Sequence, residues 1–154
     1  LKQVVSLVKV VDKEGNLLEL DNETMGFGYR TSAIKRLPFT VAEVHIQLVG
    51  GKQEEIKARM EELAAKRREK QPLEYPSAGS TFKRPEGYFA GELIMNAGLR
   101  GYQVGGAQVS EKHCGFVINK GGATAEDVKQ LISYVQTTVK SQYGVDLEPE
   151  VIIM

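Results

Sequence analysis

The sequence predicts an α+β protein, with a mixed or antiparallel sheet and helices packed on one face of it. Three observations lead to this class. Runs of β-branched and alternating apolar residues occur in several places, two stretches carry apolar residues at helical spacing, and turn-forming residues separate them. Because strands and helices alternate irregularly and two strands form a hairpin, a regular parallel sheet is not expected.

The first strands are expected near the N-terminus. Residues 3–10 are rich in β-branched side chains, the apolar pattern resumes over 17–20, and a Gly-containing turn between them predicts a hairpin. Residues 21–24 offer a capped start for one helical turn, and glycines break residues 26–32 into a loop. Residues 39–49 alternate apolar and polar side chains, which predicts a longer strand.

A charged helix is expected over residues 52–69. Ile56, Met60 and Leu63 recur at helical spacing, so we expect this apolar stripe to pack on the sheet. Opposite charges four positions apart lie on the other side, and a solvated surface explains them better than a nucleic-acid contact. The prolines of residues 70–87 then forbid a continuous helix and predict a long loop, which is often functional or interdomain.

The following segment is expected to hold a short helix and short strands. Residues 90–97 favour a helix, and Gly98 stands where such a helix ends. The glycine-rich run that follows predicts turns, and short strands are expected at Val109 and over residues 116–119.

The last helix is expected over residues 124–143. Thr124 is its N-cap, two acidic residues lie in its first turn, and Gly144 ends it. Its buried stripe consists of Val128, Leu131, Ile132, Val135 and Val139. Residues 145–154 are expected to contain a closing strand.

Composition excludes several function classes. The 154 residues fit one domain, or one domain and a piece of another, and 20 basic side chains balance 20 acidic ones. No net field therefore attracts nucleic acid or an anionic membrane, and no apolar run approaches the roughly 20 residues of a membrane span. One cysteine and two histidines argue against a metal site, and no secretory signal is seen. A soluble cytoplasmic protein is expected, and a start at Leu1 within a strand suggests a piece of a longer chain.

Residue spacing alone identifies no catalytic site. The glycines of residues 98–106 match neither a dinucleotide fingerprint nor a phosphate-binding loop, and no nucleophile elbow occurs. His45 lies on an alternating strand, which favours a structural role, and Cys114 beside an apolar run is expected to be a small buried side chain. Spacing thus leads to an α+β domain with one long loop.

Longer motifs carry more information. They occur in order at residues 26–32 (GFGYRTS), 75–85 (YPSAGSTFKRP), 90–94 (AGELI), 97–101 (AGLRG), 104–119 (VGGAQVSEKHCGFVIN) and 147–151 (LEPEV). Together they closely resemble the UDP-N-acetylenolpyruvoylglucosamine reductase family, also called the UDP-N-acetylmuramate dehydrogenases. The chain resembles the shorter subtype of that family, because it lacks the inserted loop that carries a substrate-binding tyrosine in the longer subtype.

The resemblance implies a cytoplasmic flavoprotein oxidoreductase of peptidoglycan synthesis, and so of cell-wall biogenesis, cell shape, cell division and the cell cycle. In that family NADPH reduces FAD, the flavin passes hydride to the enolpyruvyl group of a UDP-sugar, and a proton completes UDP-N-acetylmuramate. A non-catalytic nucleotide-sugar binding module is the alternative function, which also needs neither nucleic acid nor membrane.

The resemblance also implies a division of the chain. Residues 1–69 are expected to be the C-terminal part of a truncated FAD-binding domain, 70–147 the substrate-binding domain, and 148–154 a closing strand that returns toward the missing part. The family's flavin-binding glycine motifs are absent here, so no cofactor-binding residue is assigned and the fragment alone is expected to be inactive.

Three residues match the family's catalytic positions. Ser80 matches the family's proton donor, and Arg30 matches an arginine that faces the substrate carboxylate. Glu150 matches a glutamate at the same carboxylate, where it would need Arg30 or its own proton because bare carboxylates repel. Without the resemblance, Ser80 would be a turn residue, Arg30 part of a surface ion pair and Glu150 solvated. Substrate contacts are expected at Tyr29, Lys70, Arg84 and His113, with structural roles as the alternative for the last three.

Overall fold

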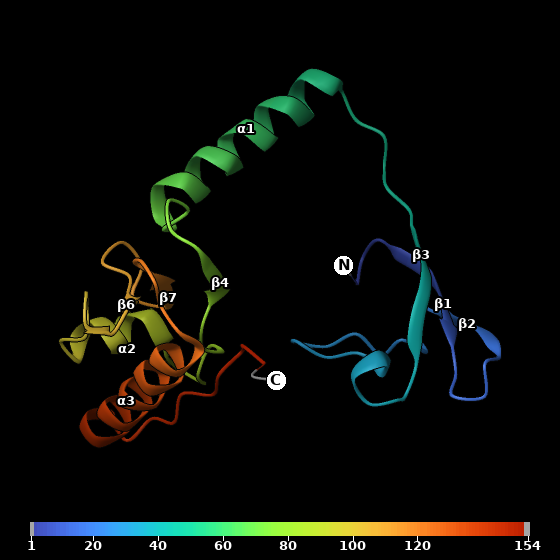
Figure 1. The fold of residues 1–154 in the computed structure, drawn as a ribbon. Helices are drawn as coiled ribbons and strands as arrows, with labels where there is room; N and C mark the ends of the chain where they lie inside the picture. The colour runs from blue at the N-terminus through green and yellow to red at the C-terminus, as the bar shows by residue number, and fades with distance from the viewer. Residues whose placement is uncertain (1, 153–154) are drawn as a thin grey trace. The chain divides into compact units, whose positions relative to one another are not determined.

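The structure is a computed structural model, in which residues 2–152 are described. The predicted α+β class is confirmed, because the described residues form three α-helices, a short 3-10 helix and two antiparallel sheets (Figure 1). The chain divides into two compact units, Leu1–Ile56 and Lys57–Met154. Each unit is described by itself below.

The first unit is built on a three-stranded sheet with the order β2-β1-β3. The central strand β1 (Val5–Val11) pairs antiparallel with β2 (Leu17–Asp21) and with β3 (Thr40–Ile46). The predicted hairpin is confirmed. Its turn is held by the carboxylate of Asp12, which accepts hydrogen bonds from the backbone N–H groups of Glu14 and Asn16.

A small core lies against this sheet. Its buried members are Val5, Val8, Val10 and Met25. The predicted helical turn is present, since the Met25 N–H donates to the Asp21 carbonyl at 3.0 Å. A 3-10 helix, η1 (Ala33–Lys35), follows and buries Ala33.

Strand β3 is shorter than the predicted strand over 39–49, and residues 47–49 lie outside it. Its apolar side chains are not a core face, because Val41, Val44 and Ile46 are 42%, 46% and 53% exposed. Pattern alone could not show this, since alternation marks two faces of a strand without showing which face is covered.

The second unit contains a four-stranded antiparallel sheet with the order β4-β7-β6-β5. The strands are β4 (Ser77–Ser80), β5 (Gln103–Val104), β6 (Ala107–Val109) and β7 (Phe116–Asn119). The prediction of an uninterrupted loop over 70–87 is therefore wrong, because β4 lies within it. Its small residues carry no apolar alternation, and backbone pairing with β7 makes the strand. Strand β5 in the glycine-rich run was likewise not predicted.

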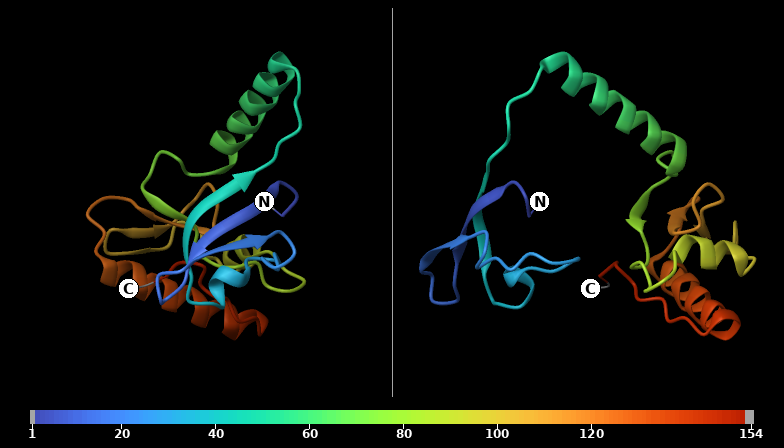
Figure 2. Two further views of the ribbon diagram at one scale, coloured as in Figure 1. Left: turned by 90° about the vertical axis from the view of Figure 1, so that its right-hand side faces the viewer. Right: turned by 180° about the vertical axis from the view of Figure 1, so that it is seen from behind.

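Two helices complete the core of this unit. Helix α3 (Ala125–Tyr143) packs on β5 and β6 and contacts α2 (Ala90–Asn96). Helix α3 is the long orange helix in Figure 2. The predicted stripe is confirmed at Leu131, Ile132, Val135 and Val139, which are buried, whereas Val128 is partly buried. Thr124 and Asp127 form a capping box, and Gly144 ends the helix at φ 69°.

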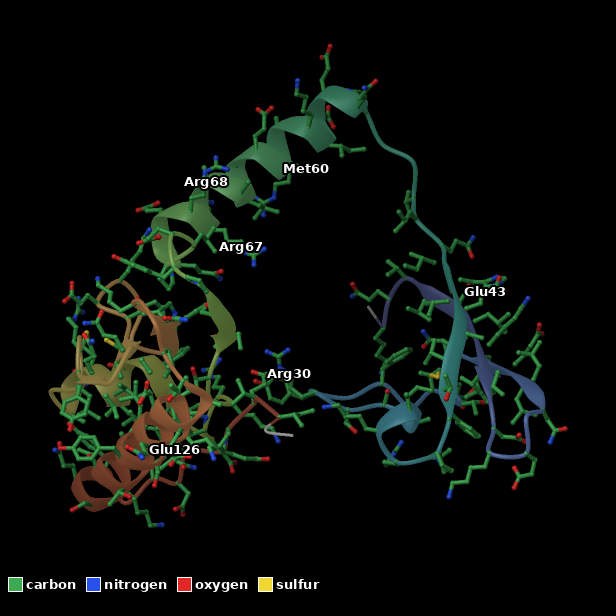
Figure 3. The ribbon with its side chains drawn as sticks, viewed as in Figure 1. Arg30, Glu43, Met60, Arg67, Arg68 and Glu126 are labelled. Atoms are coloured by element: carbon green, nitrogen blue, oxygen red, sulfur yellow. The ribbon has the colours of Figure 1, made fainter. Side chains whose placement is uncertain are left out.

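Helix α1 (Gln53–Lys70) forms as predicted, but the predicted packing of its stripe on a sheet is wrong. None of its residues is buried, and Ile56, Met60 and Leu63 are 49%, 66% and 49% exposed (Met60 is labelled in Figure 3). Helical spacing and ion pairs, such as Arg59 with Glu62 at 2.6 Å, are enough to form the helix. They do not supply a surface to cover the stripe.

The C-terminal segment differs from the predicted closing strand. Within residues 145–152 the structure has a single bridge, in which Pro149 lies opposite Phe82. Residues 153–154 of the prediction lie outside the described part of the chain. Proline has no N–H, which limits how far a ladder can extend through this segment.

Candidate active site

Arg30 and Tyr29 form the tip of a tight turn in the first unit. Gly28 and Thr31 bond to each other across it, at 3.0 Å and 3.4 Å. Arg30 has φ 55°, the left-handed region, and Figure 3 labels it at the end of this loop. Tyr29 is 72% exposed, with the Arg30 guanidinium 6.0 Å from its ring centre. The turn thus presents both predicted residues at an exposed tip.

Ser80 ends strand β4 in the second unit. It pairs with Phe116 of β7, and Gly79 before it has φ 86°, which a side chain rarely adopts. The next residue, Thr81, is anchored twice: its N–H donates to the Gly115 carbonyl at 2.8 Å, and its hydroxyl accepts from the Val117 N–H at 3.0 Å. An exposed hydroxyl therefore stands on a firmly held backbone.

Glu150 is joined to the Ser80 segment. Its N–H donates to the Thr81 carbonyl at 2.8 Å, and the Lys83 N–H donates to the Glu148 carbonyl at 2.8 Å. These bonds flank the Phe82–Pro149 pair. We call this contact of residues 81–83 with residues 148–150 the terminal bridge. It brings two of the three predicted catalytic residues into one place, although they are far apart in sequence.

His113 is linked to the same strands. Its Nδ1 accepts a hydrogen bond from the Gly115 N–H at 3.1 Å, and its ring meets the edge of Phe116 at 5.0 Å between ring centres. Phe116 is the partner of Ser80, so His113 lies beside the Ser80 strand pair. A Cβ on Gly91 would come within 3.3 Å of the His113 ring, which explains a glycine there.

Arg84 and Lys70 are placed differently. The Arg84 guanidinium lies 4.0 Å from the ring centre of Phe89, and its Nε donates to the Tyr88 carbonyl at 3.4 Å. Lys70 is exposed as the last residue of α1. Within the described part of the second unit, no hydrogen bond or ion pair joins Lys70 to the other predicted residues.

An open groove of about 610 Å³ flanks the Ser80 strand. Ala78 and Thr81 on either side of Ser80 line it, together with Val128 and Ile132 of α3 and with Val151. Most of the lining side chains are apolar. A ligand held there would gain from burial of apolar surface more than from charge.

The glycine-rich run does not fit a flavin diphosphate. A Cβ on Gly105 would come within 2.4 Å of the Asp127 carboxylate, and one on Gly106 would meet backbone atoms of Ala123 and Gly121 at 2.4 Å. The space beside these glycines is therefore filled, and by an anion. The hydrogen bond from the Thr124 N–H, together with that from the Gly106 N–H, lowers the Asp127 pKa, so this carboxylate stays charged and repels phosphate.

The remaining predicted residues have structural surroundings. Cys114 is buried in the core of the second unit, as predicted, and burial raises the pKa of its thiol. His45 is partly exposed on β3, where its Nε2 lies 2.5 Å from a Glu43 carboxylate oxygen. The described residues contain no group of three or more side chains suited to a metal, and no described helix is long and apolar enough to cross a membrane.

Two charged residues at the terminal bridge were not singled out from the sequence. Lys83 and Glu148 form an ion pair across it. Both lie inside quoted motifs, one three residues after Ser80 and the other two residues before Glu150. Proximity to the predicted catalytic residues was the available signal, but their pairing depends on a contact that only the fold reveals.

Known proteins are similar to this chain over its whole length. A model of the UDP-N-acetylenolpyruvoylglucosamine reductase C-terminal domain matches residues 71–154. The reductase of that name from Lachnoclostridium phytofermentans is 58% identical over 151 residues, which cover 98% of this chain and 49% of that protein. The one from Caldanaerobacter subterraneus is 54% identical over 154 residues, covering 100% and 51%.

A solved structure agrees with these relatives. The crystal structure of UDP-N-acetylenolpyruvylglucosamine reductase from Thermus caldophilus aligns with a TM-score of 0.81 and 36% identity, over 99% of this chain and 54% of that one. The fold is therefore that of the matching part of this reductase structure. Because the family model covers more than half of the residues, the chain belongs to the UDP-N-acetylenolpyruvoylglucosamine reductase family. It spans about half the length of the curated relatives it matches.

Proposed function

We propose that this chain supplies the substrate-handling part of a reductase that converts UDP-N-acetylenolpyruvoylglucosamine to UDP-N-acetylmuramate for peptidoglycan. The observation that carries the proposal is the terminal bridge, which joins the segments of Ser80 and Glu150 within a chain of this family. NADPH is the reductant, FAD is the cofactor, a UDP-sugar is the substrate and the cytoplasm is the location. Nothing in the proposal requires nucleic acid or a membrane.

Each catalytic residue has a chemical task in this proposal. The Ser80 hydroxyl donates a proton to the carbon next to the substrate carboxylate. This carbon becomes very basic once hydride has added to the neighbouring methylene carbon, and the proton completes the reduction. Arg30 binds that carboxylate, because a planar guanidinium makes two charge-assisted hydrogen bonds to the developing dianion. Glu150 lies at the same carboxylate. It needs either Arg30 or its own proton there, because two bare carboxylates repel each other. Tyr29, Lys70, Arg84 and His113 contact the nucleotide-sugar.

The cofactor belongs to another part of the enzyme in this proposal. Bound FAD would supply the hydride chemistry, but the space beside Gly105 and Gly106 is filled by Asp127 and by backbone atoms and offers no phosphate cradle. Residues 1–69 are proposed as the end of the flavin-binding domain, 70–147 as the substrate domain, and 148–154 as a return toward the flavin-binding part. The half of the relatives' length that this chain does not match would then hold most of the cofactor site.

The test is an assay of the full-length protein that contains this chain. With NADPH and the enolpyruvyl UDP-sugar, we expect a product two hydrogen masses heavier than the substrate, identified by mass spectrometry. The alternative, a non-catalytic nucleotide-sugar binding module, predicts binding of the UDP-sugar in calorimetry without any product. Calorimetric binding with no product would therefore overturn the proposed activity and support the alternative.

A further inference from the structure

The two halves of the terminal bridge are anchored unequally. Residues 81–83 are fixed to β7 and the core, because Thr81 bonds to two β7-side backbone groups and Phe82 is buried. On the other side, Leu147 is buried and its carbonyl accepts from the Gln136 side chain at 2.8 Å. Beyond Leu147, the chain reaches Glu150 through the bridge. The position of Glu150 relative to Ser80 therefore depends on what holds the bridge closed.

Pro149 limits what the backbone can contribute to this contact. Pro149 lies opposite Phe82 at a position of the antiparallel pair where no backbone N–H donates across the bridge. Its missing N–H therefore removes no hydrogen bond from the contact. The backbone bonds of the bridge are therefore the two bonds that flank Pro149, from the Lys83 N–H to the Glu148 carbonyl and from the Glu150 N–H to the Thr81 carbonyl, both at 2.8 Å. So short a ladder opens readily unless side chains support it.

A side-chain ion pair spans the same contact. The Lys83 ammonium bonds to the Glu148 carboxylate, and the backbone groups of the same two residues bond to each other. The side chains are 36% and 69% exposed, so the pair adds little to global stability. It closes the end of the terminal bridge that is opposite to the Thr81–Glu150 bond beside Ser80, so its local effect is to keep the two segments paired.

We propose that Lys83 is a positioning residue, whose ion pair with Glu148 closes the terminal bridge and fixes Glu150 relative to Ser80. The inference rests on the proposed function, because it gives the pair a role only if Ser80 and Glu150 act on one substrate. It assigns Lys83 no contact with the substrate. Opening of the bridge would displace Glu150 while leaving the Ser80 strand in place.

The test uses variants of the full-length enzyme. Lys83→Met and Glu148→Gln should each lower kcat about 2- to 5-fold, because an exposed ion pair shifts the closing of the bridge by no more than about fivefold, with KM little changed. Lys83→Arg should keep most of the activity. The exchange Lys83→Glu with Glu148→Lys should recover most of the loss, because it restores the pair with reversed polarity. The control is Lys66→Met, which breaks an exposed ion pair with Glu62 on α1 and should change neither constant.

The outcomes separate this inference from a direct role of Lys83. If Lys83 touched the substrate, KM would rise in Lys83→Met, Glu148→Gln would have little effect, and the exchange would not restore activity. That pattern would overturn the inference, as would normal turnover in both single variants. Melting temperatures identify loss of fold, and the exchange variant decides the question even if Lys83→Met unfolds.

The proposed function can fail separately. Ser80→Ala is measured in the same assay. If the unaltered enzyme forms no product, the proposed function fails. If Ser80→Ala is as active as the unaltered enzyme, the proposed role of Ser80 fails and the positioning role loses its premise. If Ser80→Ala is inactive while both bridge variants turn over normally, only the positioning role fails.

Discussion

At the scale of single residues, Arg30 combines an unusual backbone with a proposed catalytic role. It is the non-glycine residue with positive φ among residues 2–152, and it occupies the second central position of a two-residue turn. Glycine or asparagine is usual there, and another side chain costs about 1–3 kcal/mol. A cost of this kind is retained where the side chain itself is needed, which agrees with a carboxylate-binding arginine.

Substitution of Arg30 tests whether its planar fork matters beyond its charge. Arg30→Lys keeps the charge and loses the two parallel donors, so kcat/KM of the full-length enzyme should fall about 10²-fold. Steady-state kinetics measure this change, and the exposed Arg68→Lys on α1 is the control. Full activity in Arg30→Lys would leave the turn without a catalytic explanation.

At the scale of elements, patterns predicted the helices and the hairpin but not every contact. Thr124 and Gly144 were identified as the ends of α3 because caps have a local chemistry that sequence shows directly. Strand β4 was missed because it depends on backbone pairing with β7. The exposed stripe of α1 was misjudged because burial depends on a partner surface, which lies outside the local sequence.

The close contact between the β5–β6 turn and the residues just before α3 gives a sharp stability prediction. Gly106→Ala should lower the free energy of unfolding by about 1–3 kcal/mol or more, because the new Cβ would be 2.4 Å from the Ala123 nitrogen and the Gly121 oxygen. Urea denaturation measures the change. Gly50→Ala, whose Cβ would meet no atom within 4 Å, is the control and should change stability by less than about 0.5 kcal/mol. Equal effects would contradict this account of the contact.

Two leucines of the second unit test the difference between its helices. Leu131 of α3 is fully buried, so Leu131→Ala should cost about 2–5 kcal/mol. Leu63 of α1 is 49% exposed, so Leu63→Ala should change the unfolding free energy of this 154-residue chain by less than about 1 kcal/mol. A comparable loss in both variants, measured by thermal denaturation, would mean that the α1 stripe is packed after all.

At the scale of the whole molecule, the sequence predicted the family and the fold class. It predicted which residues form the site, but not which contacts bring their segments together. The motifs identified Ser80, Arg30 and Glu150 by resemblance, and the fold then joined the segments of Ser80 and Glu150 through backbone bonds. The supporting Lys83–Glu148 pair could not be predicted, because charges 65 positions apart carry no signature of their pairing.

The same scale gives a prediction about the cofactor. The 154-residue chain alone should bind FAD weakly or not at all, because its glycine run is packed against Asp127 and offers no diphosphate cradle. Absorbance of the chain after gel filtration with added FAD measures this. A yellow sample with one flavin per chain would contradict the division of the enzyme that we propose.

The most direct test of the central claim is the effect of Ser80→Ala in the full-length enzyme. Loss of a positioned proton donor should slow product formation about 10²–10⁴-fold, while NADPH consumption without the sugar substrate stays normal. Ser80→Cys should keep part of the activity, because a thiol is also small and can donate a proton. The fall should be in kcat rather than KM, since proton transfer occurs only in the transition state. Product formation by Ser80→Ala at the unaltered rate would remove Ser80 from the chemistry and leave its motif as a structural turn.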